Sequence, residues 1–339
     1  MKKILDEKGL TLTELLMAAG IMALMVMFIG KFLLDSYSSN LYLQSTTDLG
    51  NYSQQTVNQI RLDLSQSKRI LDNSEHGLGY WRSAFFPEKF QPIEGSTLPE
   101  IVPQGSLSPS NVDDFKNPYV PESVGNALFY AEHRPALEDK DSGRIIDLYR
   151  FVSYFLHESH EARFSNQRPY FLDLMRCESK PYADYYQMYH IKEENIRRSL
   201  LNMLEQSNVV ALWDYQASAE VAFTPLQNFE PGDFPLNQHL IQMDHCRSVI
   251  PQLGRADRPA GSLTYSVAFN KTDSFPIKLP VPLYAKARLE TPSFPHGLEI
   301  MIVGPKNGRQ VLIRLVLAAN ITTQIVSRES SVIASVKDS

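Results

Sequence analysis

The sequence predicts an α+β protein in which a long N-terminal helix precedes a head built on an antiparallel β-sheet. Three observations predict it. Residues 15–34 are almost entirely apolar, apolar residues at helical spacing continue beyond them, and most of the later chain reads as strands bounded by turn residues. With 339 residues, the chain is long enough for a sizeable head outside the helix.

The apolar stretch predicts a membrane span. Residues 15–34 contain one charge, Lys31, which lies near one end and can extend toward the headgroups. About 20 helical residues cross a bilayer core. Because Lys2, Lys3 and Lys8 precede the stretch and no basic cluster follows it, the positive-inside rule predicts a cytoplasmic N-terminus and a single-pass protein with its head outside.

One carboxylate, Glu14, opens this apolar stretch. A charged side chain costs roughly 2.5–3.5 kcal/mol at the bilayer centre, so a mere anchor would avoid it. Residues 9–15, GLTLTEL, resemble the processing site of type IV pilins and type II secretion pseudopilins. The resemblance implies cleavage by a prepilin peptidase between Gly9 and Leu10, N-methylation of Leu10, and Glu14 as the fifth mature residue. Leu10 departs from the phenylalanine or methionine most common in that family.

The new amine at Leu10 is the partner that the resemblance implies for Glu14. An α-amine is largely protonated at neutral pH because its reference pKa is about 7.7–8.0. At about 4 Å the attraction is worth roughly 4 kcal/mol at an effective dielectric of 20, comparable with the insertion cost. The amine belongs to the same chain or to a neighbouring subunit. The resemblance implies the neighbouring subunit, because that is the pairing described for the family. The alternative is an uncleaved anchor whose Glu14 lies unpaired among the headgroups.

The domain scheme that follows has a leader at residues 1–9, a transmembrane helix half at 10–34, an amphipathic helix half at 35–72 and an extracytoplasmic α+β head at 73–339. The amphipathic half is predicted from Val57, Ile60, Leu64 and Leu71, which recur at helical spacing. This is the pilin-like plan of a helix half in the membrane and half packed on a head.

Within the head, residues 87–121 are rich in proline and predict a long loop. Residues 127–133 and 145–156 predict a β-hairpin around the polar turn at 139–143. These strands also resemble a hairpin of the large PilW-like and J-type minor pilins and pseudopilins. The paired aspartates of the turn fail the calcium-loop pattern further on, so we expect no metal there.

The rest of the head predicts an inserted lobe and a return to strands. Residues 183–204 have the spacing of an amphipathic helix, which suggests a partly helical lobe at about 166–259. Strands are expected at 283–289, 298–303 and 311–317, with a hairpin at Asn307-Gly308. The polar tail, 327–339, shows no targeting motif.

Cys177 and Cys246 are the only cysteines. In an oxidising compartment they can form a disulfide, provided that their Cα atoms lie within about 7 Å. Two buried free thiols are the alternative that the sequence leaves open.

No residue pattern predicts catalysis. The histidines of the 157–161 segment, HESHE, are three apart rather than the four of a zinc-protease helix. Asp244, His245 and Cys246 are only adjacent in sequence, and catalytic groups meet in space. We therefore expect neither an enzyme nor a cofactor. The net charge of −5 without a basic cluster argues against a nucleic-acid partner.

The resemblance therefore implies a minor pilin that is processed by prepilin peptidase and lies at or near the tip of a type IV pilus-like fibre, where a large head avoids clashes along the shaft. Its expected partners are other pilins or pseudopilins, the peptidase, inner-membrane lipid and the assembly platform. Its expected location is the bacterial inner membrane with the head in the periplasm, then the fibre. The alternatives are a type II secretion J-type pseudopilin and a membrane-anchored adhesin or ligand-binding head.

Overall fold

The computed structural model describes residues 11–103, 123–140, 142–159, 171–226, 241–250, 265–268, 297–321 and 324–336. The chain divides into two compact units, residues 1–48 and 49–339. The helices and strands, in chain order, are α1 (Leu12–Leu64), β1 (Ser67–Leu71), α2 (Glu75–Ser83), β2 (Ala84–Phe85), η1 (Glu88–Phe90), β3 (Ile101–Val102), β4 (Leu128–Asp139), β5 (Arg144–Ser159), β6 (Phe171–Glu178), β7 (Tyr182–Asp184), α3 (Tyr185–Tyr189), α4 (Glu194–Gln206), β8 (Ala211–Trp213), β9 (Phe223–Pro225), β10 (Ile241–Gln242), β11 (His245–Ser248), β12 (Tyr265–Val267), β13 (Leu298–Val303), η6 (Lys306–Gly308), β14 (Arg309–Ile321) and β15 (Gln324–Val336).

The first unit carries the N-terminal part of α1. Its large apolar side chains from Leu12 to Leu34 are exposed. So large an apolar surface is unusual for a soluble protein and needs lipid or another protein to cover it. By length and composition α1 can cross a membrane, although a signal sequence near an N-terminus meets the same criteria.

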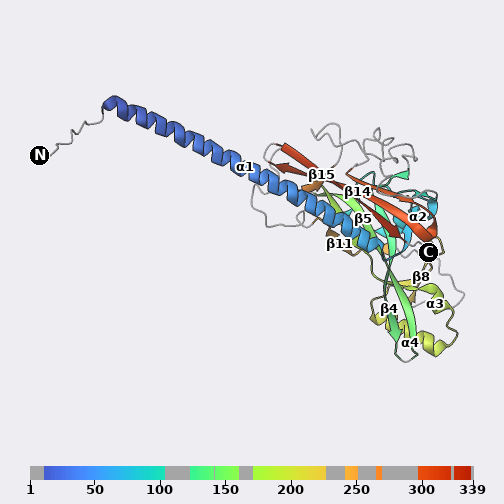
Figure 1. Ribbon diagram of the computed structural model, residues 1–339. Coiled ribbons are helices and arrows are strands. Elements are labelled where there is room, and N and C mark those ends of the chain that lie inside the picture. Colours follow the sequence, from blue (N-terminus) through green and yellow to red (C-terminus); the bar gives the residue numbers. More distant parts are fainter. Residues whose placement is uncertain are drawn as a thin grey trace. The chain divides into compact units, whose positions relative to one another are not determined.

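The second unit is built on a mixed sheet (Figure 1). One path through it runs β3-β13-β14-β12-β6-β5-β7-β8-β9, while β4 joins β5, β1 joins β4, β11 joins β6 and β15 joins β14. The protein is therefore α+β, with a long N-terminal helix followed by a sheet-rich domain. This confirms the coarse fold class that the sequence predicts.

Both faces of the central sheet are buried. On β5, Val152, Tyr154 and Leu156 lie in one core cluster with Val57, Ile60 and Leu64 of α1. The alternate β5 residues Phe151 and Phe155 lie in a second, aromatic cluster with Tyr80 of α2, Trp213 of β8 and Phe223 of β9. Successive side chains of a strand point to opposite faces, so β5 separates these two layers.

The predicted hairpin is confirmed. β4 and β5 pair antiparallel from Leu128↔Tyr154 to Asp139↔Arg144, and both strands are longer than expected. Gly143 has a φ of 65°, which favours glycine, and the Asp139 carboxylate accepts a hydrogen bond from the Ser142 amide. This is an ordinary local turn. Asp141 lies outside the described residues.

The amphipathic helix ends earlier than predicted. Val57, Ile60 and Leu64 are buried as expected, but α1 stops at Leu64, and Leu71 belongs to β1. The chain turns at Ser65 and Gln66, whose amides donate to Arg61 and Asp63 carbonyls. In β1, Ile70 and Leu71 then enter opposite core clusters, which a strand allows because its side chains alternate.

The predicted helix at 183–204 is two helices. Asp184 caps α3 by accepting a hydrogen bond from the Gln187 amide, and α3 is followed by α4 after a short break. Figure 1 shows both helices beside the end of the β4–β5 hairpin that carries its turn. Within the expected lobe at 166–259, β6 and β11 belong to the main sheet rather than to a separate body.

The sheet is mixed rather than purely antiparallel. β7 and β8 pair parallel because the chain between them crosses over through α3 and α4. β3, within the expected loop at 87–121, pairs parallel with β13. Residues 104–121 of that loop, and the expected strand at 283–289, lie outside the described residues.

Of the predicted C-terminal strands, β13 has the expected bounds, whereas β14 extends beyond the expected 311–317 at both ends. β13 and β14 form the predicted hairpin around Asn307-Gly308. Most of the polar tail forms β15, which pairs antiparallel with β14 along its full length. Val326, Val332, Ala334 and Val336 occupy even-numbered positions of β15 and therefore lie on one side of the strand, which packs on the core.

Candidate functional site

The first turn of α1 holds Glu14 through a capping box. Glu14 Oε2 accepts hydrogen bonds from the Thr11 amide at 3.0 Å and from the Thr11 hydroxyl at 2.9 Å, while the Glu14 amide donates to Thr11 Oγ1 at 3.3 Å. This reciprocal pair satisfies amide groups that a helix N-terminus leaves free. Glu14 therefore has a local structural role that the sequence analysis missed, although the T-x-x-E pattern that signals it is present.

The expected partner of Glu14 is not placed by the structure. Gly9 and Leu10, the processing residues, lie outside the described residues, so the pairing of Glu14 with a new amine at Leu10 stays a prediction. Glu14 is exposed, and its two hydrogen bonds within the described part of the chain both go to Oε2 rather than to Oε1. The capping box thus occupies one carboxylate oxygen and leaves the other accessible.

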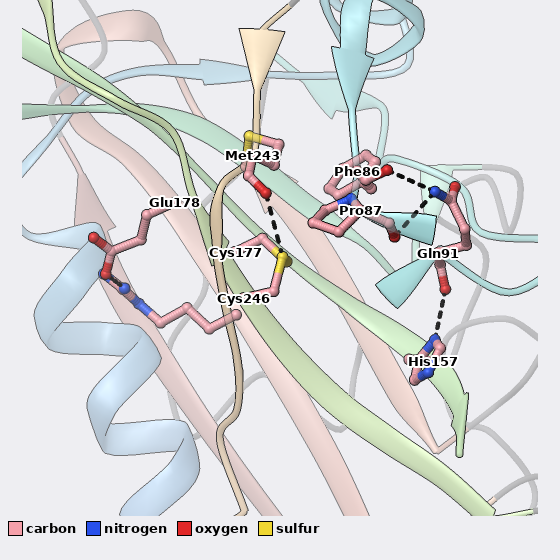
Figure 2. The surroundings of a disulfide bond; sticks show 9 residues. Phe86, Pro87, Gln91, His157, Cys177, Glu178, Met243 and Cys246 are labelled. Atoms are coloured by element: carbon pink, nitrogen blue, oxygen red, sulfur yellow. Dashed lines mark hydrogen bonds and ion pairs between the residues drawn. A yellow bond between two sulfur atoms is a disulfide. The ribbon is translucent and has the colours of Figure 1, made fainter. Parts of the chain in front are cut away.

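The structure joins Cys177 and Cys246 in a disulfide (Figure 2). The two cysteines face each other across the antiparallel pair of β6 and β11, with their Cα atoms 4.0 Å apart. Cys177 is completely buried among the aromatic cluster, whereas Cys246 is partly exposed. Of the two alternatives that the sequence leaves open, the structure therefore contains the disulfide.

On the opposite face of β6, the residues that flank Cys177 form an ionic network. Arg176 Nε lies 2.6 Å from Asp63 Oδ2, in the last turn of α1. Arg150 Nη2 donates to Glu132 Oε1 at 2.8 Å, and both arginines also contact Glu178. These charges come from α1, β4, β5 and β6, so the network joins the helix to three neighbouring strands.

The network is largely buried and includes tyrosines. Tyr154 donates its hydroxyl to Asp63 Oδ2 at 2.5 Å. Burial, together with the Asp63 carboxylate, raises the pKa of Tyr154 well above its usual value, so the phenol stays protonated. An aspartate near a helix C-terminus faces the negative end of the helix dipole, and Arg176 offsets that unfavourable position. The sequence does not predict this network, because its residues lie far apart along the chain.

The remaining motifs show ordinary contacts. His157, at the end of β5, lies 2.8 Å from the Gln91 carbonyl through Nδ1, as Figure 2 shows. His160 and Glu161 lie outside the described residues. Asp244 pairs with Lys180, and Cys246 is in the disulfide. In the described part of the chain, no group of three or more acidic, histidine or cysteine side chains is arranged to hold a metal.

Comparison with known proteins adds no family: no protein-family model, curated protein or solved structure matches this chain. Among the residues that the structure describes, one N-terminal helix can span a membrane by length and composition, and a sheet-rich domain follows it.

Proposed function

We propose that this chain is a minor subunit of a type IV pilus-like fibre. It is cut between Gly9 and Leu10 by a prepilin peptidase, methylated at Leu10, and inserted at or near the fibre tip. The observation that carries the proposal is the position of Glu14, five residues after Gly9 and at the start of a long apolar helix.

The chemistry of the first turn supports the proposal. The capping box fixes one oxygen of Glu14 against Thr11 and leaves the other accessible to an amine. A neighbouring subunit whose Leu10 amine lies beside that oxygen would neutralise the charge that a bilayer disfavours. Membrane insertion and docking would then depend on the same carboxylate.

The exposed apolar surface of α1 supports a second part of the proposal. Lipid covers the large apolar side chains from Leu12 to Leu34 before assembly, and the helices of neighbouring subunits cover them in the fibre. The second unit, residues 49–339, is too large to repeat along a tightly packed shaft, which favours the tip. The same features fit the corresponding tip subunit of a type II secretion pseudopilus.

The capping box makes a sharp experiment available. Glutamine at the third helical position also completes a capping box, so Glu14→Gln removes the charge and keeps the cap, whereas Glu14→Ala removes both. We expect both variants to be cleaved after Gly9 and both to be lost from sheared fibres in immunoblots. Glu205→Gln, at an exposed position on α4, is the matched control and should be recovered like the wild type.

The outcome for the glutamine variant decides between two roles of Glu14. If Glu14→Gln enters fibres as well as the wild-type chain while Glu14→Ala does not, the cap is sufficient and the docking charge is refuted. If both variants enter fibres normally, Glu14 has no role in assembly.

A further inference from the structure

The two sulfurs of the disulfide differ in their access to solvent. Cys177 lies on β6 and is fully buried in the cluster that also contains Phe86, Met175 and Met243. Cys246 lies on β11 and is partly exposed, with exposed residues on either side of it. Figure 2 shows Cys246 on the thin β11 segment and Cys177 on the broad β6 strand beneath it.

The two strands also differ in how firmly they are held. β6 is paired on both sides at Cys177, with Ser153 of β5 on one side and Cys246 of β11 on the other. β11 is four residues long and, among the described residues, its strand pairing is to β6 alone. Local opening of a folded protein favours short segments with few partners, so β11 opens more readily than β6.

We propose that Cys246 is the exchange sulfur of this disulfide and that Cys177 is the buried thiol that completes it. The reacting partner is an external disulfide oxidant, which approaches from the exposed side of β11. This goes beyond the fibre function and does not depend on it, because it concerns the head alone.

The exchange proceeds in two balanced steps. The Cys246 thiolate attacks one sulfur of the external disulfide, forms a mixed disulfide and displaces the first external thiolate. The Cys177 thiolate then attacks the Cys246 sulfur, forms the Cys177–Cys246 bond and displaces the second external thiolate. Two protein thiols are oxidised, the external disulfide is reduced to two thiols, and the two protein thiol protons pass to water or to the departing thiolates.

Because Cys246 reacts first and Cys177 second, only β11 has to move. Cys177 can remain in its buried place on β6 throughout, while β11 moves away to meet the partner and returns when the bond closes. The segment between the cysteines contains α3, α4 and the short strands β7 to β9. Exchange at Cys246 therefore lets these elements pack before the disulfide closes the loop that contains them.

Pulse labelling of the intact wild-type protein tests the proposal. The full chain, in detergent and under native conditions, is reduced with a phosphine and exposed briefly to isotopically heavy iodoacetamide. It is then denatured and labelled with the light reagent, and the ratio at each cysteine is read by mass spectrometry. We expect Cys246 to react at least about tenfold faster than Cys177, the factor that about 1.4 kcal/mol of local protection gives.

A second arm uses glutathione disulfide as the probe with single-cysteine variants. Cys177→Ser should form a glutathione adduct at Cys246 under native conditions, whereas Cys246→Ser should form one at Cys177 only in urea. If a variant fails to fold, as judged by tryptophan fluorescence, the wild-type labelling ratio decides alone. Equal labelling of the two cysteines, or faster labelling of Cys177, overturns the proposal.

Discussion

Arg176 Nε lies 2.6 Å from Asp63 Oδ2, an ion pair that joins the last turn of α1 to β6 across 113 residues of sequence. The same Asp63 oxygen accepts the Tyr154 hydroxyl. The Asp63 carboxylate, at the end of α1, therefore contacts both Arg176 of β6 and the buried hydroxyl of Tyr154 on β5. The position of the end of α1 on the sheet depends on this contact as well as on the buried side chains of Val57, Ile60 and Leu64.

Asp63→Asn should destabilise the head by roughly 1–3 kcal/mol, because it removes the charged acceptor from a buried network while keeping the side-chain size. Tryptophan fluorescence during urea unfolding of the full chain in detergent measures the change. The control is Glu220→Gln, which changes an exposed carboxylate. Its free energy of unfolding should lie within about 0.5 kcal/mol of that of wild type. A stability for Asp63→Asn equal to that of the control would show that the network contributes nothing.

Combining two variants tests whether the network acts as a unit. Asp63→Asn removes the charge of the acceptor in the 2.5 Å hydrogen bond between these residues, and Tyr154→Phe removes its donor. Their effects on the free energy of unfolding should therefore be non-additive, with a coupling of roughly 0.5–3 kcal/mol. Strict additivity in the double variant would mean that the two residues do not interact.

His76 should make the head less stable in mild acid. Arg69 donates to His76 Nε2 at 2.8 Å, so the ring must be neutral there. Burial, followed by the positive charge of Arg69, lowers the pKa of His76 in the fold, while the nearby Asp72 opposes this and Lys306 adds to it. Because the folded pKa lies below the unfolded value of about 6.5, the contribution is complete above that pH and is lost as the pH falls through and below it.

A non-titrating variant isolates the effect of His76. His76→Gln keeps a side-chain acceptor for Arg69 but carries no proton equilibrium. Between pH 7 and pH 5, wild type should lose more stability than His76→Gln, by at most about 1.4 kcal/mol per pH unit. Urea unfolding at each pH gives both curves, and parallel curves would exclude His76 as the titrating group.

The disulfide should contribute substantially to stability. The cysteines are 69 residues apart, and closing a loop of that length restricts the unfolded chain by roughly 4 kcal/mol in the chain-entropy view. The double variant Cys177→Ser/Cys246→Ser should lose about that much in urea unfolding. Adding reductant should lower the stability of wild type and leave the double variant unchanged. An equally stable double variant would show that sheet pairing alone holds β11.

The sequence predicts those parts of the fold that depend on local patterns. The hairpin of β4 and β5, the hairpin at Asn307-Gly308 and the buried stripe at Val57, Ile60 and Leu64 all follow from periodicity and turn residues. The end of α1 does not, because Leu71 keeps helical spacing by chance while tertiary pairing with β4 makes it a strand. β15 was missed because serines weaken its alternation, although its valines keep the period of a strand.

The candidate site is less predictable for a physical reason. Glu14 stands out as a charge in an apolar stretch, and its cap could have been read from Thr11. The contact of Asp63 with Arg176, and that of Cys177 with Cys246, depend on which strands become neighbours. Sequence spacing carries no such information, so the sequence names the cysteines but leaves their pairing open.

The N-terminus of the mature protein shows whether the chain is processed like a pilin subunit. The chain is produced with a prepilin peptidase, purified from membranes, and its N-terminal peptide is identified by mass spectrometry. We expect a protein that begins at N-methylated Leu10, and a Gly9→Val variant that keeps residues 1–9. Wild-type protein that retains Met1 to Gly9 in the presence of active peptidase, or that begins at any residue other than Leu10, would contradict the proposed processing.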